Sequence, residues 1–167
     1  FNFSKWNIIL AWFTFAVALV TYVMTAEPTL SFWDAGEYIA TSSKLQVGHP
    51  PGAPLYQMLG AVFSIFAPDP SQIAFMVNVM SGISAAFAVL FMFWSVVLLF
   101  KKIYPNLENG PVNRQIMVLM SAMIGGLSLT FSDSFWFNAV EAEVYAMASC
   151  IMSIMFYVGL LWERDMH

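Results

Sequence analysis

The apolar run at residues 73–100 decides the class of fold to which this chain belongs. It reads IAFMVNVMSGISAAFAVLFMFWSVVLLF, contains no charged side chain, and is followed by Lys101 and Lys102. Because a helix of about 20 apolar residues crosses the hydrocarbon core of a bilayer, this run predicts a transmembrane helix. Predominantly apolar runs of similar length predict three more transmembrane helices, at residues 6–25, 115–131 and 139–162.

The overall composition supports the same class. The chain is 60% hydrophobic and only 10% charged, which leaves too little charge to cover the surface of a water-soluble domain. Residues 1–167 therefore predict an all-α, polytopic membrane helix bundle that forms a single transmembrane module. The sequence has no basic patch that would bind nucleic acid, and its single cysteine, Cys150, provides no disulfide framework.

A fifth apolar segment, residues 54–67, is short for a transmembrane helix. If it does not cross, five of the six basic residues fall on one side of the membrane and only Lys44 falls on the other. Since Lys and Arg are enriched in cytoplasmic loops, this arrangement is favoured over a crossing segment. We therefore expect four spans with both chain ends in the cytoplasm. Residues 54–67 should form an interfacial or re-entrant helix in the first outer loop.

The acidic residues are distributed unevenly between the two sides. Acids contribute little to membrane topology, so their asymmetry is independent of the rule that orients the spans. An outer face rich in carboxylates and nearly free of cations is therefore a candidate functional surface. The acids expected there, or at its membrane boundary, are Glu27, Asp34, Glu37, Asp69, Asp133, Glu141 and Glu143.

Two of these carboxylates lie three residues apart just after the first span, in Phe32-Trp33-Asp34-Ala35-Gly36-Glu37-Tyr38. With Ser31 as a possible N-cap, we expect a helix over about residues 32–45, on which Asp34 and Glu37 share one face. Such a pair can divide the work of catalysis, because one carboxylate can accept a proton while the other orients it or raises its basicity. The simpler alternative is that both are solvated loop acids.

The segment His49-Pro50-Pro51-Gly52-Ala53-Pro54 is conformationally restricted, because its three prolines fix the backbone. Its simplest interpretation is a linker that breaks a helix. A histidine on an outer loop can also hydrogen-bond a carboxylate or a phosphate oxygen. Lys44 and His49 are thus the candidate cationic groups for substrate binding. Clustered carboxylates could hold a divalent cation, although the sequence contains no metal-binding motif of established spacing.

Glu141 and Glu143 lie at the start of the expected fourth span. Acids in the first turn of a helix interact favourably with the helix dipole, and that alone could explain them. Residues two apart, however, point to different faces of a helix. We therefore expect at least one of the two glutamates to face the bundle interior and the candidate site.

Three motifs together resemble a known family. They are Phe32-Trp33-Asp34-Ala35-Gly36-Glu37, His49-Pro50-Pro51-Gly52-Ala53-Pro54-Leu55 and Val140-Glu141-Ala142-Glu143-Val144-Tyr145-Ala146. In this order they resemble the amino-terminal region of a bacterial multi-pass membrane family catalogued as a domain of unknown function. That family is similar to the transmembrane protein O-mannosyltransferases of the GT-C glycosyltransferase class.

The resemblance implies an activity and assigns roles to residues. Enzymes of the GT-C class use a polyprenyl-phosphate sugar and place an essential acid in the first outer loop. The resemblance therefore implies that Asp34 is the catalytic carboxylate, with Glu37 as its neighbour and with His49, Glu141 and Glu143 as further motif positions. GT-C enzymes have more spans than the four expected here, so the chain should be the amino-terminal portion of a larger protein.

We therefore expect a membrane glycosyltransferase module that transfers a sugar, mannose by resemblance, from polyprenyl phosphate to a Ser or Thr hydroxyl of an exported protein. Its expected partners are membrane lipid, the lipid-linked sugar and that acceptor. Its expected location is the bacterial inner membrane, with the active face in the periplasm. A transporter, channel or scaffold subunit remains the alternative. A transporter would require ionisable residues deep within the spans, and the sequence has none there.

Overall fold

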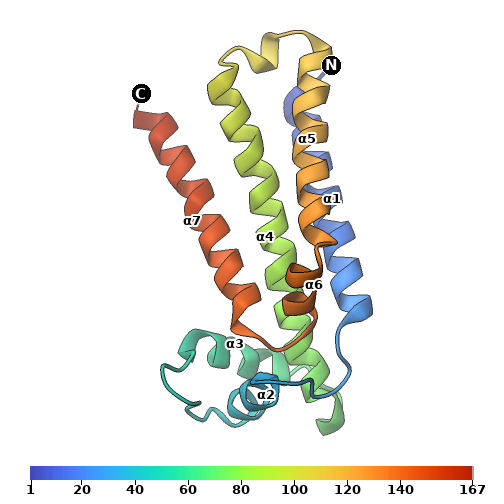
Figure 1. Cartoon of the computed structure of the whole chain (residues 1–167), viewed down its shortest axis with the longest axis vertical. Coiled ribbons are helices and arrows are strands. Elements are labelled where there is room, and N and C mark those ends of the chain that lie inside the picture. The colour runs from blue at the N-terminus through green and yellow to red at the C-terminus, as the bar shows by residue number, and fades with distance from the viewer. Residues whose placement is uncertain (167) are drawn as a thin grey trace.

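The computed structural model describes residues 1–166, and every regular element in that part of the chain is a helix. This confirms the all-α prediction (Figure 1). The elements marked η are short 3₁₀ helices. In chain order the elements are α1 (Phe3–Thr25), α2 (Ala35–Lys44), α3 (Pro54–Ser64), η1 (Pro70–Gln72), α4 (Ile73–Ile103), η2 (Leu107–Asn109), α5 (Val112–Thr130), α6 (Asp133–Val140) and α7 (Val144–Met166).

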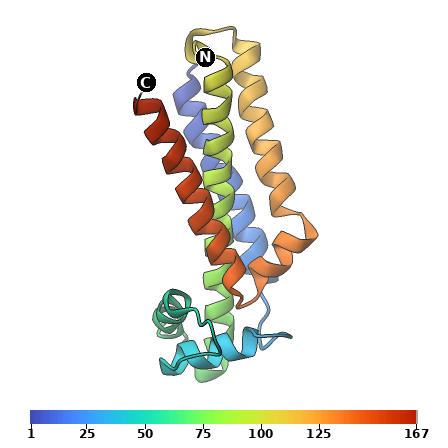
Figure 2. The same cartoon turned by 60° about the vertical axis from the view of Figure 1, so that its left-hand side comes forward.

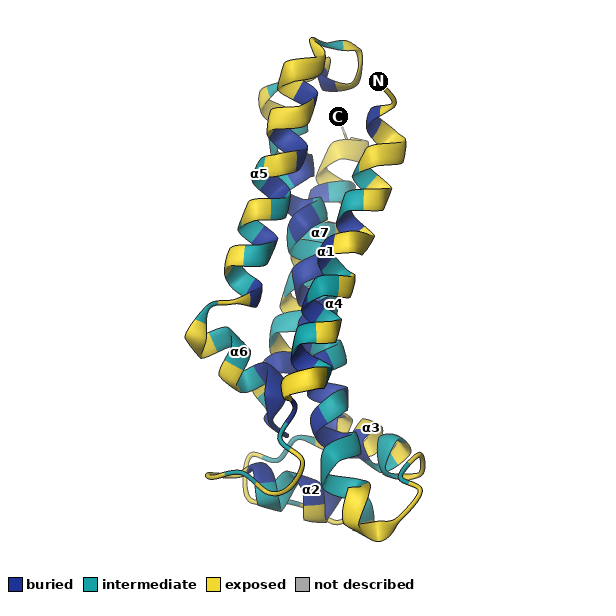
Figure 3. Ribbon diagram, turned by 90° about the vertical axis from the view of Figure 1, so that its right-hand side faces the viewer, coloured by how far each residue is buried: buried dark blue, intermediate teal, exposed yellow. Residues whose placement is uncertain are grey.

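Four segments are long and apolar enough to cross a membrane, as the sequence predicts. The first is α1, and the second consists of η1 followed by α4. The third and fourth are α5 and α7. The longest helix, α4, packs against each of the other three and forms the centre of the bundle (Figures 1 and 2). The buried residues lie mainly along α4 and on the faces that the other spans turn toward it, while the outward faces of α1 and α5 are exposed (Figure 3).

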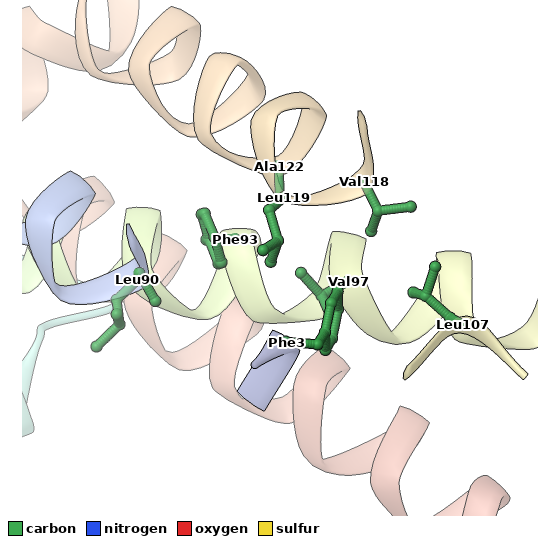
Figure 4. Close-up of a cluster of buried hydrophobic side chains, with 9 residues drawn as sticks. Phe3, Leu90, Phe93, Val97, Leu107, Val118, Leu119 and Ala122 are labelled. Atoms are coloured by element: carbon green, nitrogen blue, oxygen red, sulfur yellow. The ribbon is translucent and has the colours of Figure 1, made fainter. Parts of the chain in front are cut away.

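The bundle core consists of apolar side chains from α1, α4 and α5. Phe3, Phe93, Val97 and Leu119 are all buried and belong to one cluster, which Figure 4 shows between the helices. Small residues allow the backbones to approach closely: at Gly126 of α5, an added Cβ atom would lie 2.9 Å from Thr14 Cγ2. Close contact through small residues is the usual way in which membrane helices associate.

The segment after the first span forms a platform at one end of the bundle. Helix α3 has 11 residues, so it is about 16 Å long, roughly half the thickness of the hydrocarbon core. It lies beside α2 at this end and is not among the four candidate spans (Figure 1). The prediction of a short helix that does not cross is therefore confirmed, with its end at Ser64 rather than at residue 67.

Two predicted helix starts are wrong. Helix α2 begins at Ala35 rather than near residue 32, because Trp33 has a φ of 62°, which an α-helix does not allow. The last span begins at Val144 rather than at residue 139, because α6 ends at Val140 and Glu141 is extended. Glu141 and Glu143 therefore lie in a break between α6 and α7, and neither occupies the first turn of a helix.

The two ends of the bundle differ in charge. We call the end with α2, α3 and the α6–α7 break the loop end. The opposite end, which we call the terminal end, holds both chain termini and the turn between α4 and α5 (Figure 1). Of the basic residues, only Lys44 belongs to the loop end, whereas Lys5, Lys101, Lys102, Arg114 and Arg164 belong to the terminal end.

The charge bias predicts the orientation of the bundle, with the terminal end in the cytoplasm. In a Cys150→Ala background, Val47→Cys should react with a membrane-impermeant maleimide added to intact cells, whereas Asn109→Cys should react only after permeabilisation. Both positions are exposed, and Val47 is 92% exposed, so access depends on the side of the membrane. Outer labelling of Asn109→Cys would reverse the assigned orientation.

The adjacent glycines of α5 provide a matched test of the packing. Gly126→Ala should lower the free energy of unfolding by about 1–3 kcal/mol, because its Cβ would collide with Thr14 Cγ2 and overpack the core. Gly125→Ala should be neutral or slightly stabilising, because the nearest atom to its Cβ is Met92 Cε at 3.7 Å. Thermal unfolding in detergent measures both, and equal stability of the two variants would contradict the close contact between α1 and α5.

Candidate active site at the loop end

The candidate site begins with Asp34, which lies at the N-cap position of α2. The unusual φ of Trp33 turns the chain just before the helix starts. The Asp34 carboxylate makes no hydrogen bond to the N-terminal amides of α2, and its side chain is 57% exposed. It is therefore free to interact with groups outside the helix.

Glu37, one turn further along α2, binds His49 through both of its oxygens. The His49 backbone N–H donates to Oε1 at 2.6 Å, and the imidazole Nδ1 lies 2.9 Å from Oε2. These two hydrogen bonds, the backbone one first, hold the pKa of Glu37 below its usual range. The same carboxylate raises the pKa of His49, chiefly through the bond to Nδ1.

The other imidazole nitrogen faces Asp34. His49 Nε2 lies 3.9 Å from Asp34 Oδ2, so the histidine stands between the two carboxylates of α2. Ligand atoms of Asp34, Glu37 and His49 all lie within 4.8 Å of one another, which makes these three residues able to hold a metal ion. The sequence predicts that Asp34 and Glu37 face the same way, and in the structure both carboxylates lie beside His49 on the following loop.

Two glycines allow the loop that carries His49 to return to α2. Gly48 packs so tightly that a Cβ there would lie 2.8 Å from Gln57 Nε2 and 3.0 Å from Glu37 Oε1. After His49 the chain turns at Gly52, whose φ of 76° suits glycine and whose N–H donates to the His49 carbonyl at 2.8 Å. The Pro-rich segment is therefore more than a helix-breaking linker, since it presents His49 to α2.

The α6–α7 break adds two glutamates that are largely buried. Glu141 and Glu143 are each only 7% exposed. Glu141 accepts a hydrogen bond of 2.7 Å from Ser31 Oγ, whereas the Glu143 carboxylate accepts none within residues 1–166. Burial, and after it the charges of Asp34 and Glu141, raise the pKa of Glu143 to about 6.

Most of the predicted site residues come together. Asp34, Glu37 and His49 lie close together, and Glu143 lies in the α6–α7 break at the same end of the bundle. Glu141 is adjacent and held by Ser31. Lys44 is exposed in the last turn of α2 and takes part in none of the ion pairs of the described chain, so its predicted role in binding stays a prediction.

Two side chains of the site were not among the predicted residues. Burial raises the pKa of Tyr38, and the charges of Glu143, Asp34 and Glu37 raise it in the same direction. Its ring centroid lies 6.4 Å from that of His49. Ser31 was considered only as a helix cap. Both residues adjoin the acidic motif, and that proximity was the one signal that could have found them.

A helix bundle with four candidate membrane spans indicates a polytopic membrane protein, and a carboxylate–histidine cluster lies at one end of this bundle. Residues 34–167 match the protein O-mannosyl-transferase TMEM260 N-terminal domain family, and the chain belongs to that family. The predicted resemblance to protein O-mannosyltransferases is confirmed at this level. A bacterial origin stays a prediction.

Two curated relatives support the assignment. The chain is 29% identical over 151 residues to "Protein O-mannosyl-transferase tmem260" of Dictyostelium discoideum, and 33% identical over 150 residues to "Protein O-mannosyl-transferase TMEM260" of Mus musculus. Each alignment covers 90% of this chain but only 16% and 19% of the respective relative. The chain thus spans less than a fifth of the length of these relatives. No solved structure matches it.

The bond between Ser31 and Glu141 ties the first loop to the α6–α7 break, and its removal tests the assembly of the site. Ser31→Ala should lower the free energy of unfolding by about 1.5–3 kcal/mol, because a partly buried carboxylate loses its donor. The matched change Thr29→Val removes a hydroxyl that bonds the more exposed Glu27 and should have little effect. Thermal unfolding of both variants measures the two losses of stability. Equal losses would show that Ser31 does not anchor the loop.

Proposed function

We propose that this chain is the amino-terminal membrane module of a GT-C-type glycosyltransferase. The enzyme would transfer a sugar, mannose in our proposal, from a polyprenyl-phosphate donor to a Ser or Thr hydroxyl of an exported protein. The observation that carries the proposal is the cluster of Asp34, Glu37 and His49 at the loop end, in a chain of this family. The proposed location is the bacterial inner membrane, with the loop end in the periplasm.

The chemistry of such a transfer requires a base more than an acid. Polyprenyl phosphate leaves as a stable anion and needs no proton, whereas the acceptor hydroxyl must lose one as it attacks the sugar. We assign that role to Asp34. Its carboxylate is half exposed and makes no hydrogen bond within residues 1–166, whereas both oxygens of Glu37 bind His49. Glu37 would act by positioning His49 beside Asp34.

The lipid part of the donor would lie between the spans. A cavity of about 400 Å³ between α4 and α7 is lined mainly by apolar side chains, including Ala88, Met92, Met152 and Phe156. It shares residues with a second cavity of about 360 Å³, which adds polar groups near the α6–α7 break, among them Asn138 and Tyr145. An apolar cavity that becomes polar toward the acids suits a lipid with a phosphate head group.

The alternative of a transporter gains no support. Ion and proton pathways place ionisable residues inside the membrane, facing the bundle interior. In the described spans, the Asp, Glu, Lys and Arg side chains lie only near the helix ends, such as Lys5 in α1, Lys101 and Lys102 in α4, and Arg114 in α5. The acids of the loop end thus have no continuation through the bundle.

The assignment of the base predicts the effect of Asp34→Asn in the full-length protein. Transfer from a radiolabelled polyprenyl-phosphate mannose should fall by about 10²–10⁴-fold, because an amide cannot accept the acceptor's proton. The melting temperature should not change, because Asn is as good an N-cap as Asp and no hydrogen bond is lost.

Asp69→Asn is the matched control, because Asp69 is another exposed acid of the loop end and caps η1 through Ser71. It should retain transfer. Glu37→Gln, assayed beside Asp34→Asn, separates the roles of the two motif acids. Turnover near that of the wild type by Asp34→Asn would remove the proposed base, and a loss confined to Glu37→Gln would transfer the role to Glu37.

A further inference from the structure

A cavity at the terminal end plays no part in the proposed function. It has a volume of about 520 Å³ and lies between α4 and α7, which diverge toward this end (Figures 1 and 2). Its lining combines cationic and apolar side chains from both helices. They include Leu98, Lys101, Lys102, Leu160, Glu163 and Arg164.

The cavity is apolar on its inner side and cationic at its rim. Leu98 of α4 and Leu160 of α7 are both buried. Lys102 and Arg164 lie closer to the ends of their helices and are partly exposed. Trp162, two residues before Arg164, is exposed, and exposed tryptophans of membrane helices mark the level of the lipid head groups. The cavity therefore meets both the head groups and the acyl chains of one leaflet.

The cations of the rim retain unused hydrogen-bond donors. Lys102 Nζ bonds Glu163, and an ammonium group has three donors. Arg164 bonds Asp165 through Nε at 2.7 Å, and its two terminal NH₂ groups have no hydrogen-bond partner within residues 1–166. Exposed ion pairs of this kind contribute little to stability. A phosphate group can therefore compete with these carboxylates for the cations.

The lining favours an amphiphilic occupant. A further transmembrane helix packed against this cavity would bury Lys102 and Arg164 among apolar side chains, which is costly. A free phosphate ion would leave Leu98 and Leu160 without an apolar partner. A phospholipid suits both parts, because its phosphate would meet the cations while its acyl chains cover the leucines. Basic pockets between membrane helices are a general form of binding site for anionic lipid head groups.

We propose that this cavity binds an anionic phospholipid, with its phosphate held by Lys102 and Arg164 and its acyl chains between α4 and α7. The leaflet with the negative surface potential is the cytoplasmic one, and the charge bias predicts that the terminal end faces the cytoplasm. The polyprenyl donor of the proposed function would enter from the loop end. The two phosphates would therefore lie in opposite leaflets, and the phospholipid site does not depend on the proposed function.

A photoreactive phosphatidylglycerol, with a diazirine near the head-group end of its acyl chain, is the probe. The full-length protein is placed in phosphatidylcholine nanodiscs that contain a trace of this lipid, and crosslinked residues are identified by mass spectrometry. Crosslinks should concentrate at residues 98–105 and 157–166, on the two walls of the cavity. A phosphatidylcholine with the same diazirine should show no such enrichment. The mole fraction of unlabelled phosphatidylglycerol that halves the yield measures the affinity.

Two charge changes of opposite sign assign the site to residues. Arg164→Gln should weaken binding about fivefold, the effect expected of one basic residue near an anionic lipid surface. Glu163→Gln should strengthen binding by a similar factor, because it removes an acid of the lining and releases Lys102 from its ion pair. Lys5→Gln is the matched control and should bind as the wild type does, because Lys5 is a basic residue of the same end that does not line the cavity.

The crosslinking results decide between the lipid and its alternatives, whatever the transfer assay shows. An absence of crosslinks from both walls would overturn the proposal, and it is the result expected if further spans of a longer protein fill the cavity. Equal enrichment of the phosphatidylcholine probe would remove the selectivity for anionic lipid. An equal loss in Lys5→Gln would reduce the effect to general surface charge. Weaker binding in Glu163→Gln would contradict competition between Glu163 and the phosphate, and each of these results would overturn the site.

Discussion

The hydrocarbon core of the bilayer excludes charge, and the rest of this structure depends on that constraint. It leaves only two places for ionisable side chains, the two ends of a bundle whose spans are apolar. At the terminal end the charges neutralise one another, as in the pairs Lys101–Glu108 and Lys102–Glu163. At the loop end the acids have one histidine among them. The excess of carboxylates over cations sets the loop end apart from the terminal end.

Helix α4 connects this end to the spans. Asn78, buried near its start, donates to the carbonyls of Glu27 and Thr29 at 2.6 and 3.2 Å, which fixes the chain as it leaves α1. Three residues along, Ser81 Oγ pairs with the Tyr56 hydroxyl of α3 at 2.9 Å. The platform of α2 and α3 is therefore held by hydrogen bonds to the central helix. The platform beside the site is thus tied to the same helix that organises the membrane core.

Apolar runs and charge bias were enough to predict the four spans, because hydropathy is decided by the residues themselves. The same information failed at the start of α7. Ala139 and Val140 extend the apolar run, and no Pro or Gly marks the break. The interruption instead depends on a tertiary contact, the hydrogen bond of 3.0 Å from the Glu27 N–H to the Val140 carbonyl. A contact between residues so distant in sequence leaves no local signature.

The sequence was enough to predict which residues belong to the candidate site, but not which contacts each of them makes. Spacing placed Asp34 and Glu37 on one helical face, and the three motifs indicated His49, Glu141 and Glu143. Nothing in the sequence shows that His49 uses both oxygens of Glu37, or that Ser31 binds Glu141. Those contacts separate the acids physically. Glu37 and Glu141 are held by protein donors, whereas Asp34 and Glu143 have none in the described chain. Asp34 and Glu143 are therefore the two motif carboxylates whose oxygens accept no hydrogen bond from residues 1–166.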